Sequence, residues 1–262
     1  MTDDLPRFEA LSLDRRGRLL RITLNRPEVL NAFNQAMHEG LAEAFEFAAA
    51  DPGSDVIVLT GAGRAFSAGG DLDRMQSFID DPQLFEGEVA TARRLILALL
   101  DIEKPVIARV NGAAVGLGAT LALMCDVIFA DEDAKIGDPH VKVGLVAGDG
   151  GAVIWPQLVG FARAKEYLMT GRLIPAREAA AMGLINHAVP GAALDEAVDA
   201  FCDELLGGAR EAIRWTKATI NIELKRIAND LLEPGLAYEW QSVSTEAHRK
   251  AIAALRAGDK KT

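Results

Sequence analysis

The spacing of apolar residues along the chain changes several times, and each change marks an expected element. Alternating or continuous apolar runs predict strands at residues 8–13, 19–24, 56–59, 105–110 and 127–130, the first two joined by a hairpin turn at 14–18. Apolar positions three and four residues apart predict helices over residues 37–51 and around 95–100. Glycine-rich loops at 61–71 and 111–118 follow two of the strands. This succession predicts an α/β fold with right-handed β-α-β crossovers.

The pattern beyond Asp149 is mainly helical, with one short strand near residues 185–189. Helical spacing runs from Ile213 to Leu231, Glu-Pro-Gly at 233–235 predicts a break, and a final helix extends to about Leu255. We therefore expect one core over residues 1–205, followed by a helical region over 206–262.

Composition narrows the functional classes. The 262 residues are 50% hydrophobic and 25% charged, as in soluble globular proteins. There are 28 Lys and Arg residues against 38 Asp and Glu, so the net charge of -10 disfavours a nucleic-acid partner. Residues 209–262 differ, with ten basic residues against seven acidic ones, which suits an anionic ligand.

Cysteine usage and the terminal sequence predict a cytoplasmic location. Cys125 and Cys202 lie far apart and belong to no cysteine or histidine cluster, which disfavours a zinc site or a disulfide framework. The first residues contain no basic and apolar secretory pattern, and the longest weakly polar stretch, 112–124, is too short to cross a bilayer. We expect no membrane partner.

Several familiar motifs are excluded by single residues. Leu121 stands where a dinucleotide fingerprint needs its third glycine, and no phosphate loop or His-Glu-x-x-His metal motif occurs. Ser67 follows Ala65 where a nucleophile elbow needs glycine. The two glycine loops then have two readings. They form tight turns only, or their backbone N–H groups converge on a carbonyl oxygen as an oxyanion hole.

Four segments together resemble the crotonase (enoyl-CoA hydratase/isomerase) superfamily. They are LNRPEVLNAF (24–33), LTGAGRAFSAGGDL (59–72), KPVIARVNG (104–112) and LMTGR through AAAMGLI (168–185). The resemblance implies the crotonase (ClpP-like) fold, a spiral of β-β-α repeats with two roughly perpendicular sheets. It also implies that region 206–262 builds a homotrimer or a hexamer and covers part of the active site.

The resemblance further implies an acyl-CoA thioester substrate and a role such as fatty acid metabolism. No cofactor or metal is expected, since coenzyme A is part of the substrate. The oxyanion donors would be the N–H groups of Gly70 and Leu117. Residues implied in substrate binding are Arg26, Ala32, Ala68, Gly69, Asp71, Gly116 and Gly118. The family often has a lysine near the CoA phosphates where this chain has Glu28, so Arg26 and the basic tail of Arg256, Lys260 and Lys261 are alternatives.

The sequence departs from the hydratase pattern at both catalytic glutamates. The matching positions hold Thr120 and His140, and a threonine hydroxyl cannot act as a general base at neutral pH. His140 with Asp149 resembles the pair that activates water in the 6-oxocamphor hydrolase branch, whose members cleave C–C bonds of β-diketones. That branch also has a histidine in the loop where this chain keeps Gly116-Leu117-Gly118. Asp149 also suits a helix N-cap, His140 a pocket wall, and Asp138 either a turn or a partner of His140.

Three functions therefore stay open. The first is an enzyme acting on an acyl-CoA thioester through an enolate, with His140 and Asp149 moving a proton or a water. The second is a C–C bond hydrolase of β-diketones that uses the same pair. The third is a family member that binds acyl-CoA without turnover.

Overall fold

The chain folds around a six-stranded sheet, as seen in a computed structural model that describes residues 5–259. The strand order is β1 (Leu11–Arg16), β2 (Leu19–Leu24), β3 (Val56–Gly61), β5 (Val106–Val110), β7 (Val127–Asp131) and β10 (His187–Val189). β1 and β2 form the expected antiparallel hairpin, although β1 begins three residues later than predicted. All other neighbours are parallel, which confirms the expected β-α-β connections.

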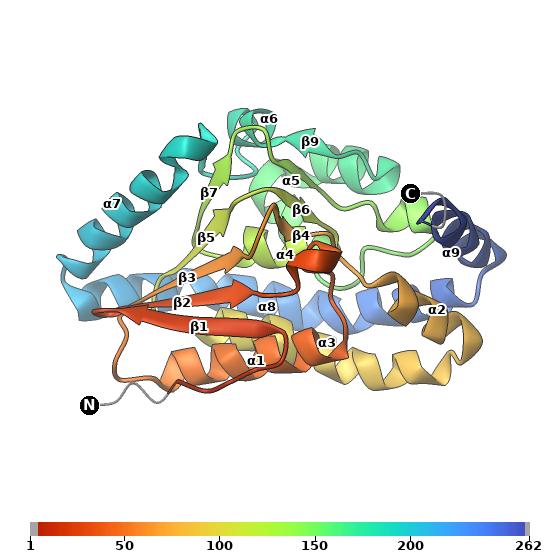
Figure 1. Cartoon of the computed structure of the whole chain (residues 1–262), viewed down its shortest axis with the longest axis horizontal. Helices are drawn as coiled ribbons and strands as arrows, with labels where there is room; N and C mark the ends of the chain where they lie inside the picture. Colours follow the sequence, from red (N-terminus) through yellow and green to blue (C-terminus); the bar gives the residue numbers. More distant parts are fainter. Residues whose placement is uncertain (1–4, 260–262) are drawn as a thin grey trace.

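A second sheet of four short strands packs beside the first (Figure 1). It contains β4 (Ala65–Ser67), β6 (Ala113–Val115), β8 (Lys135–Gly137) and β9 (Ile174–Pro175). β4 and β6 lie inside the two glycine-rich segments, where runs of three residues are too short to show a period of two. The two sheets and their surrounding helices confirm the fold class that the resemblance implies.

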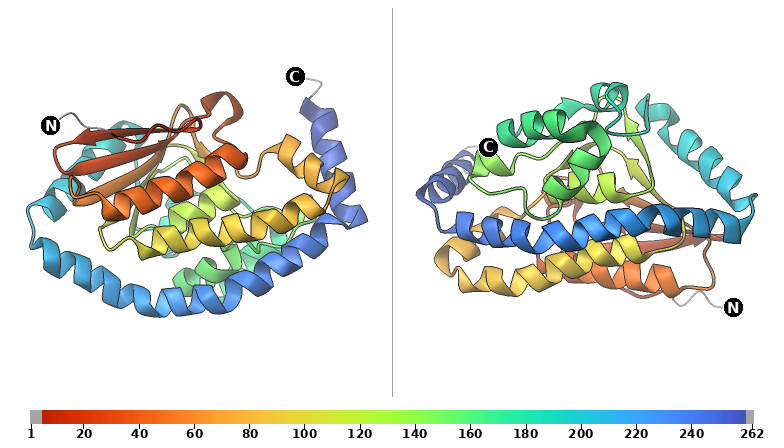
Figure 2. Two further views of the ribbon diagram at one scale, coloured as in Figure 1. Left: turned by 90° about the horizontal axis from the view of Figure 1, so that it is seen from below. Right: turned by 180° about the vertical axis from the view of Figure 1, so that it is seen from behind.

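Helices cover both sides of the large sheet. α1 (Gln35–Ala50), α3 (Gln83–Asp101) and α8 (Arg210–Val243) run side by side along one side of the molecule (Figures 1 and 2). The other helices are α2 (Leu72–Asp80), α4 (Leu117–Met124), α5 (Gly151–Thr170), α6 (Ala176–Ala181), α7 (Leu194–Leu206) and α9 (Glu246–Asp259). Single 3-10 turns occur at Pro27–Val29, His140–Val143 and Gly191–Ala193. None of the helices within residues 5–259 has both the length and the apolarity needed to span a membrane.

The first four residues of β3 are all apolar because both faces of the strand are buried. Ile57 and Leu59 belong to the main core, which also contains residues of α1, α3 and α4. Val56 and Val58 face the other way and pack against α7, including Cys202. A strand buried on both faces has no reason to alternate, which explains the continuous apolar run in the sequence.

The predicted break at residues 233–235 is wrong, because α8 continues through Pro234 and ends at Val243. Proline inside a helix costs about 3 kcal/mol, and here that cost is offset by the burial of Leu232 and Leu236 on the inner face of α8. Gly235 lies where α8 packs closely against the loop before α5. A Cβ on Gly148 would lie 2.2 Å from the carbonyl oxygen of Gly235, so α8 and the loop before α5 touch through backbone atoms.

Candidate functional site

The side chain of Asn31 holds the first glycine loop in place. Asn31 has a left-handed backbone (φ 56°), which asparagine tolerates better than most residues. Its buried Nδ2 donates to the carbonyl oxygens of Ala62 and Ala65 at 2.9 Å, and its Oδ1 accepts from the Arg26 N–H at 2.9 Å. The segment before α1 is thereby tied to the loop after β3.

Ser67 has a structural position in the same loop. Its buried hydroxyl donates to the carbonyl oxygen of Asn31 at 2.8 Å and accepts from the Gly69 N–H at 3.1 Å. Because backbone groups engage the hydroxyl on both sides, the geometry disfavours a nucleophilic role for Ser67.

The two glycine loops meet at Gly69 and Gly116, which both have positive φ (88° and 55°). A Cβ on Gly69 would lie 2.8 Å from the carbonyl oxygen of Val115, and a Cβ on Gly116 would lie 3.7 Å from the Gly69 Cα. Only glycine combines this backbone conformation with so close an approach. The contact brings the following residues, Gly70 and Leu117, to neighbouring turns.

The N–H groups of Gly70 and Leu117 are free to bind a ligand. Among the hydrogen bonds of residues 5–259, neither group donates to a protein acceptor, and both residues line the same pocket. Leu117 is the first residue of α4, where an N–H has no partner within the helix. Its φ is negative and its side chain is buried in the core, so leucine is compatible with a donor at this position.

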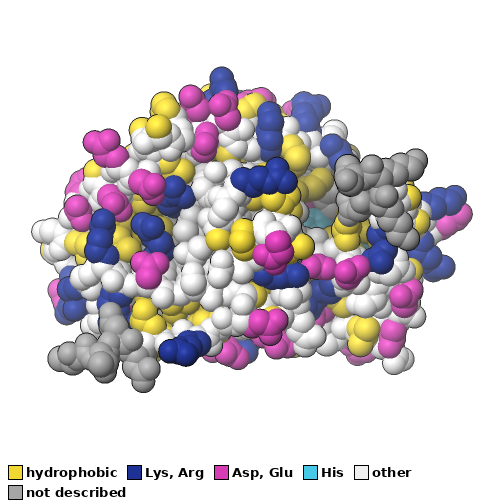
Figure 3. Space-filling model, in the orientation of Figure 1, with side chains coloured by type: hydrophobic (Ala, Val, Ile, Leu, Met, Phe, Trp, Pro, Cys, Tyr) yellow, Lys and Arg dark blue, Asp and Glu magenta, His cyan; other side chains and the backbone are white. Residues whose placement is uncertain are grey.

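The pocket joins an apolar lining to a group of ionisable side chains. Its apolar lining includes Phe33, Met75, Phe78, Phe85, Ala92, Leu145, Leu236 and Val243, and its ionisable lining includes His38, Asp71, Arg74, Glu88, His140, Asp149, Glu239 and His248. The outer surface next to it has no field of one sign. On the face shown in Figure 3, positive and negative side chains are interspersed, and a histidine is visible in a hollow near the C-terminal end.

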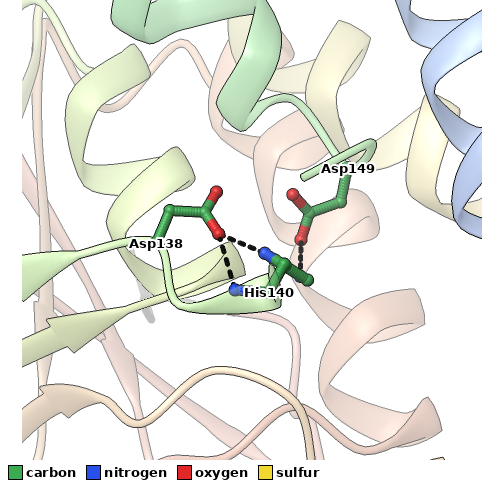
Figure 4. Close-up of side chains that lie close together, drawn as sticks. All are labelled: Asp138, His140 and Asp149. Carbon is green, nitrogen blue, oxygen red and sulfur yellow. Dashed lines mark hydrogen bonds and ion pairs between the residues drawn. The ribbon is translucent and has the colours of Figure 1, made fainter. Parts of the chain in front are cut away.

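His140 lies between two carboxylates (Figure 4). Asp138 Oδ1 accepts a hydrogen bond from His140 Nδ1 and a second one, at 3.2 Å, from the His140 backbone N–H. On the opposite side of the ring, Asp149 Oδ2 lies 3.4 Å from Nε2. All three side chains are buried. Two carboxylates on opposite sides of the imidazole ring therefore fix its orientation.

The surroundings of His140 favour its charged form. Burial by itself would lower the pKa of His140, but the negative charges and hydrogen bonds of Asp138 and Asp149 outweigh burial and raise that pKa well above 6.5. Asp138 also lies against the start of α5, since a Cβ on Gly151 would be 2.1 Å from its Oδ2. The positive end of that helix favours a carboxylate there. The surroundings of His140 therefore favour the imidazolium, a form that can donate a proton.

Asp149 precedes α5 without capping it. The helix begins at Gly151, and its N-cap is Gly150 (φ 116°), so the N-cap interpretation of Asp149 is wrong. Asp149 Oδ1 is buried and has no hydrogen-bond partner within the described chain. Thr120 is also buried, on α4, and its hydroxyl oxygen likewise has no recorded partner there. Asp149 therefore keeps one carboxylate oxygen available in the pocket.

Glu239, on α8, is a residue of this site that the sequence did not suggest. Its side chain is 6% exposed, and its Oε2 has no partner among the described residues. Burial raises the pKa of Glu239 to about 8, the negative charges of Asp149 and Asp138 add to the increase, and His140 and the Gly148 N–H oppose it. The group is consequently a neutral carboxylic acid at pH 7 for most of the time.

A signal for Glu239 was present in the sequence. The residues Leu232, Leu236, Glu239 and Val243 repeat at spacings of four, three and four, and all are buried on one face of α8. A glutamate inside such an apolar stripe is rarely buried without a reason. Only the fold shows that this stripe faces the loop that carries Asp149.

Asp138, His140 and Asp149 also have the proximity that a metal site requires, because one ligand atom from each lies within 4.8 Å of the others. Both nitrogen atoms of the His140 ring, however, already face a carboxylate oxygen. A metal ion would have to displace one of these contacts. The arrangement is better suited to holding and moving a proton.

The predicted binding residues fall into three groups. Ala68, Gly69 and Gly116 line a cavity next to His140. Arg26 and Asp71 form an ion pair at 3.0 Å, with Arg26 also donating to the carbonyl oxygen of Ala32 at 2.6 Å. Gly118 packs against Ser67, where a Cβ would come within 2.6 Å of the serine Cβ. Their roles in substrate binding stay predictions.

The basic tail is only partly described. Arg256 on α9 forms an ion pair with Asp73 on α2 at 2.6 Å, which joins the C-terminal helix to α2. Lys260 and Lys261 lie outside the described residues. A contact between this tail and phosphate groups stays a prediction.

Comparison with known proteins places these features in a family context. A sequence profile described as enoyl-CoA hydratase/isomerase matches residues 14–254. A probable enoyl-CoA hydratase from Rhizobium meliloti is 35% identical over 253 residues, which cover 95% of either chain. The crystal structure of an enoyl-CoA hydratase/isomerase from Mycobacterium paratuberculosis superposes with a TM-score of 0.89 at 39% identity, covering 96% of this chain and 99% of that one.

A further similar structure has a different activity. It is a β-diketone hydrolase from the cyanobacterium Anabaena, bound to (S)-3-oxocyclohexyl acetic acid. It superposes with a TM-score of 0.85 at 28% identity, covering 92% of this chain and 98% of that one.

Proposed function

Because the chain belongs to the enoyl-CoA hydratase/isomerase family, we propose that it catalyses proton transfer on an acyl-CoA thioester through an enolate. One observation carries the proposal. The backbone N–H groups of Gly70 and Leu117 have no acceptor among residues 5–259, and both residues line the same buried pocket as His140, Asp149 and Glu239. Such donors stabilise the negative charge that develops on a thioester oxygen, each by about 3 kcal/mol.

The side chains divide the work of moving the proton. The free oxygen of Asp149 accepts the proton from the carbon next to the carbonyl, and the electron pair of that C–H bond moves to the carbonyl oxygen. His140, held by Asp138, keeps Asp149 oriented and balances its charge. Glu239, a neutral acid, delivers a proton to the enolate. This assignment needs neither of the two glutamates that hydratases of the family use.

Exchange of the α-protons tests the enolate step whatever the final product is. Hexanoyl-CoA incubated with the enzyme in D2O should gain deuterium next to the carbonyl, as measured by mass spectrometry. His140→Ala and Asp149→Asn should slow the exchange by about 10²-fold or more. His187→Ala, at an exposed histidine on β10, is the matched control and should exchange at the wild-type rate.

Two results would count against the assignment. If both site variants exchange as fast as the wild type, the proton is moved elsewhere. If hexanoyl-CoA binds but no acyl-CoA ever exchanges or turns over, the chain is an acyl-CoA-binding member without activity.

Hydrolysis of a C–C bond is the second candidate, favoured by the His140–Asp149 pair and by the similarity to the Anabaena β-diketone hydrolase. In this reaction, Asp149 takes a proton from water, the resulting hydroxide attacks one carbonyl, and the C–C bond breaks. The departing enolate binds the N–H groups of Gly70 and Leu117 and is then protonated. Turnover of a free cyclic β-diketone with no benefit from CoA would establish this reaction and overturn the acyl-CoA proposal.

We also infer that the chain assembles into a homotrimer or a hexamer through residues 206–262. Large apolar side chains are exposed along α8 and include Trp215, Ile220, Ile222 and Tyr238. Exposed apolar side chains on one long helix are typical of a surface that another subunit covers. Light scattering at micromolar concentration should give the mass of three or six chains, and a monomer would contradict the inference.

A further inference from the structure

The pocket contains a second polar cluster, formed by His38 on α1, Arg74 on α2 and Glu88 on α3. The three side chains are only 12–14% exposed. They lie on the wall made by these helices, whereas His140 and Asp149 come from the segment between β8 and α5. The proposed chemistry uses none of the three.

The cluster is internally connected but incompletely satisfied. Arg74 Nη2 forms an ion pair with Glu88 Oε1, and the guanidinium carbon lies 5.5 Å from the centre of the Phe78 ring. Arg74 Nη1 and His38 Nδ1 are buried and have no hydrogen-bond partner among the described residues. His38 Nδ1 is 3.8 Å from Glu88 Oε2, beyond hydrogen-bond distance. A buried polar atom without a partner is costly. Arg74 Nη1 is always a donor, and His38 Nδ1 is one in the tautomer that carries the proton there, so these two atoms suit a ligand that supplies an acceptor.

The charges of the cluster indicate which acceptor fits. Burial and the nearby positive charge of Arg74 lower the pKa of His38 to about 3, so the imidazole is neutral at pH 7. Glu88 already neutralises Arg74 through the ion pair. A second carboxylate brought by a ligand would face Glu88 and be repelled. A neutral oxygen accepts from the free Arg74 Nη1 without that repulsion.

The position of the cluster is consistent with contact to the remote part of a substrate. Asp71, Arg74, Phe78 and Glu88 line both the inner pocket and a second, more open cavity that includes Arg26. This wall separates the reacting end of the pocket from the outer cavity. An acyl chain that starts at the oxyanion donors and follows the apolar lining can end at this wall.

We propose that Arg74 and His38 form a specificity subsite for acyl groups that carry a neutral oxygen, such as a ketone, away from the thioester. The inference rests on the proposed acyl-CoA function and adds a substrate class to it. The competing explanation is that the Arg74–Glu88 pair only fastens α2 to α3 and that water satisfies the free atoms.

Binding of saturated thioester pairs tests the subsite. Hexanoyl-CoA is compared with 5-oxohexanoyl-CoA, and octanoyl-CoA with 7-oxooctanoyl-CoA, by isothermal titration calorimetry. We expect at least one oxo compound to bind about tenfold more tightly than its parent, as a hydrogen bond to a charged donor allows. Arg74→Lys retains a positive charge but loses the second donor of the guanidinium, so the ratio should fall to about one.

Two further variants make the test independent of stability. Arg94→Lys changes an arginine that pairs with Glu46 between α3 and α1 on the surface, outside this pocket, and should keep the wild-type ratio. Glu88→Gln leaves the charge of Arg74 uncompensated. It should therefore bind adipoyl-CoA, which ends in a carboxylate, about tenfold more tightly than the wild type does. A gain of binding cannot result from misfolding.

The outcomes separate this inference from the proposed function. If hexanoyl-CoA and octanoyl-CoA bind but every oxo-to-parent ratio is one, or Arg74→Lys keeps the wild-type ratio, the subsite is refuted and the acyl-CoA function stands. If no CoA thioester binds, the proposed function fails and this inference fails with it.

Discussion

Replacing Glu239 with glutamine tests whether a buried neutral acid sets the pH dependence of this protein. Its pKa rises from 4.5 to about 8, a shift worth ~5 kcal/mol in favour of the protonated form. A group with this pKa is about 90% protonated at pH 7 and about 10% at pH 9. If Glu239 is the acid, the wild-type rate should fall above pH 8. Glu239→Gln should lack this decline and be slower at pH 7 by about 10²-fold, because an amide cannot donate the proton.

The same shift predicts how stability depends on pH. Since the pKa of Glu239 is raised by folding, its stabilising contribution is complete below pH 4.5, its unfolded value, and is lost as the pH rises through about 8. Between pH 4.5 and pH 7, the loss is on the order of 3 kcal/mol. Glutamine does not titrate. From pH 4.5 to pH 7, the unfolding free energy of Glu239→Gln should therefore rise relative to that of the wild type by about 3 kcal/mol.

Urea unfolding at several pH values measures this difference. The matched control is Glu233→Gln, on the same helix, which removes a carboxylate that water already solvates. It should follow the wild type at every pH. Glu239 also faces Asp149, Asp138 and His140. These groups are present in both proteins, so they shift only the pH at the midpoint of the change in unfolding free energy. If the difference in unfolding free energy between the wild type and Glu239→Gln stays constant from pH 4.5 to pH 9, the pKa of Glu239 is not raised by folding.

Three other substitutions separate chemistry from structure. Leu117→Pro removes an N–H at the first position of α4, where helices tolerate proline, and should lower kcat by 10²–10³-fold. Leu117→Ala keeps the N–H and should retain most of the activity. Equal losses of kcat in both variants would exclude a donor role for this N–H. Ser67→Ala should lower the unfolding free energy by about 1–3 kcal/mol, as measured by urea titration, yet leave turnover within tenfold of the wild type. Loss of turnover in a folded Ser67→Ala variant would indicate instead that Ser67 is a nucleophile. Asp138→Asn should lower kcat by about 10²-fold with little change in KM, because the amide no longer fixes the ring of His140. An unchanged kcat would show that catalysis does not need the contact between Asp138 and His140.

Local sequence patterns were sufficient to predict strands and helices where the burial of an element is regular. The run at residues 56–59 was recognisable as a strand because both of its faces are buried, and the helix over 37–51 because only one of its faces is. The same reasoning was wrong at Pro234, where the chemistry of one residue predicted a break but packing of Leu232 and Leu236 kept the helix intact. Tertiary contacts there outweigh a local cost of about 3 kcal/mol.

The sequence by itself determined the family resemblance, the order of the main elements and the two glycine loops, in which the resemblance predicts donors at Gly70 and Leu117. These features depend on residues close together in the chain. Only the tertiary structure decided that Glu239 joins His140 and Asp149, and that His38, Arg74 and Glu88 share one wall of the pocket. The physical reason is that burial and charge act through space. A glutamate becomes a neutral acid, and an arginine keeps a free donor, because of neighbours contributed by distant segments.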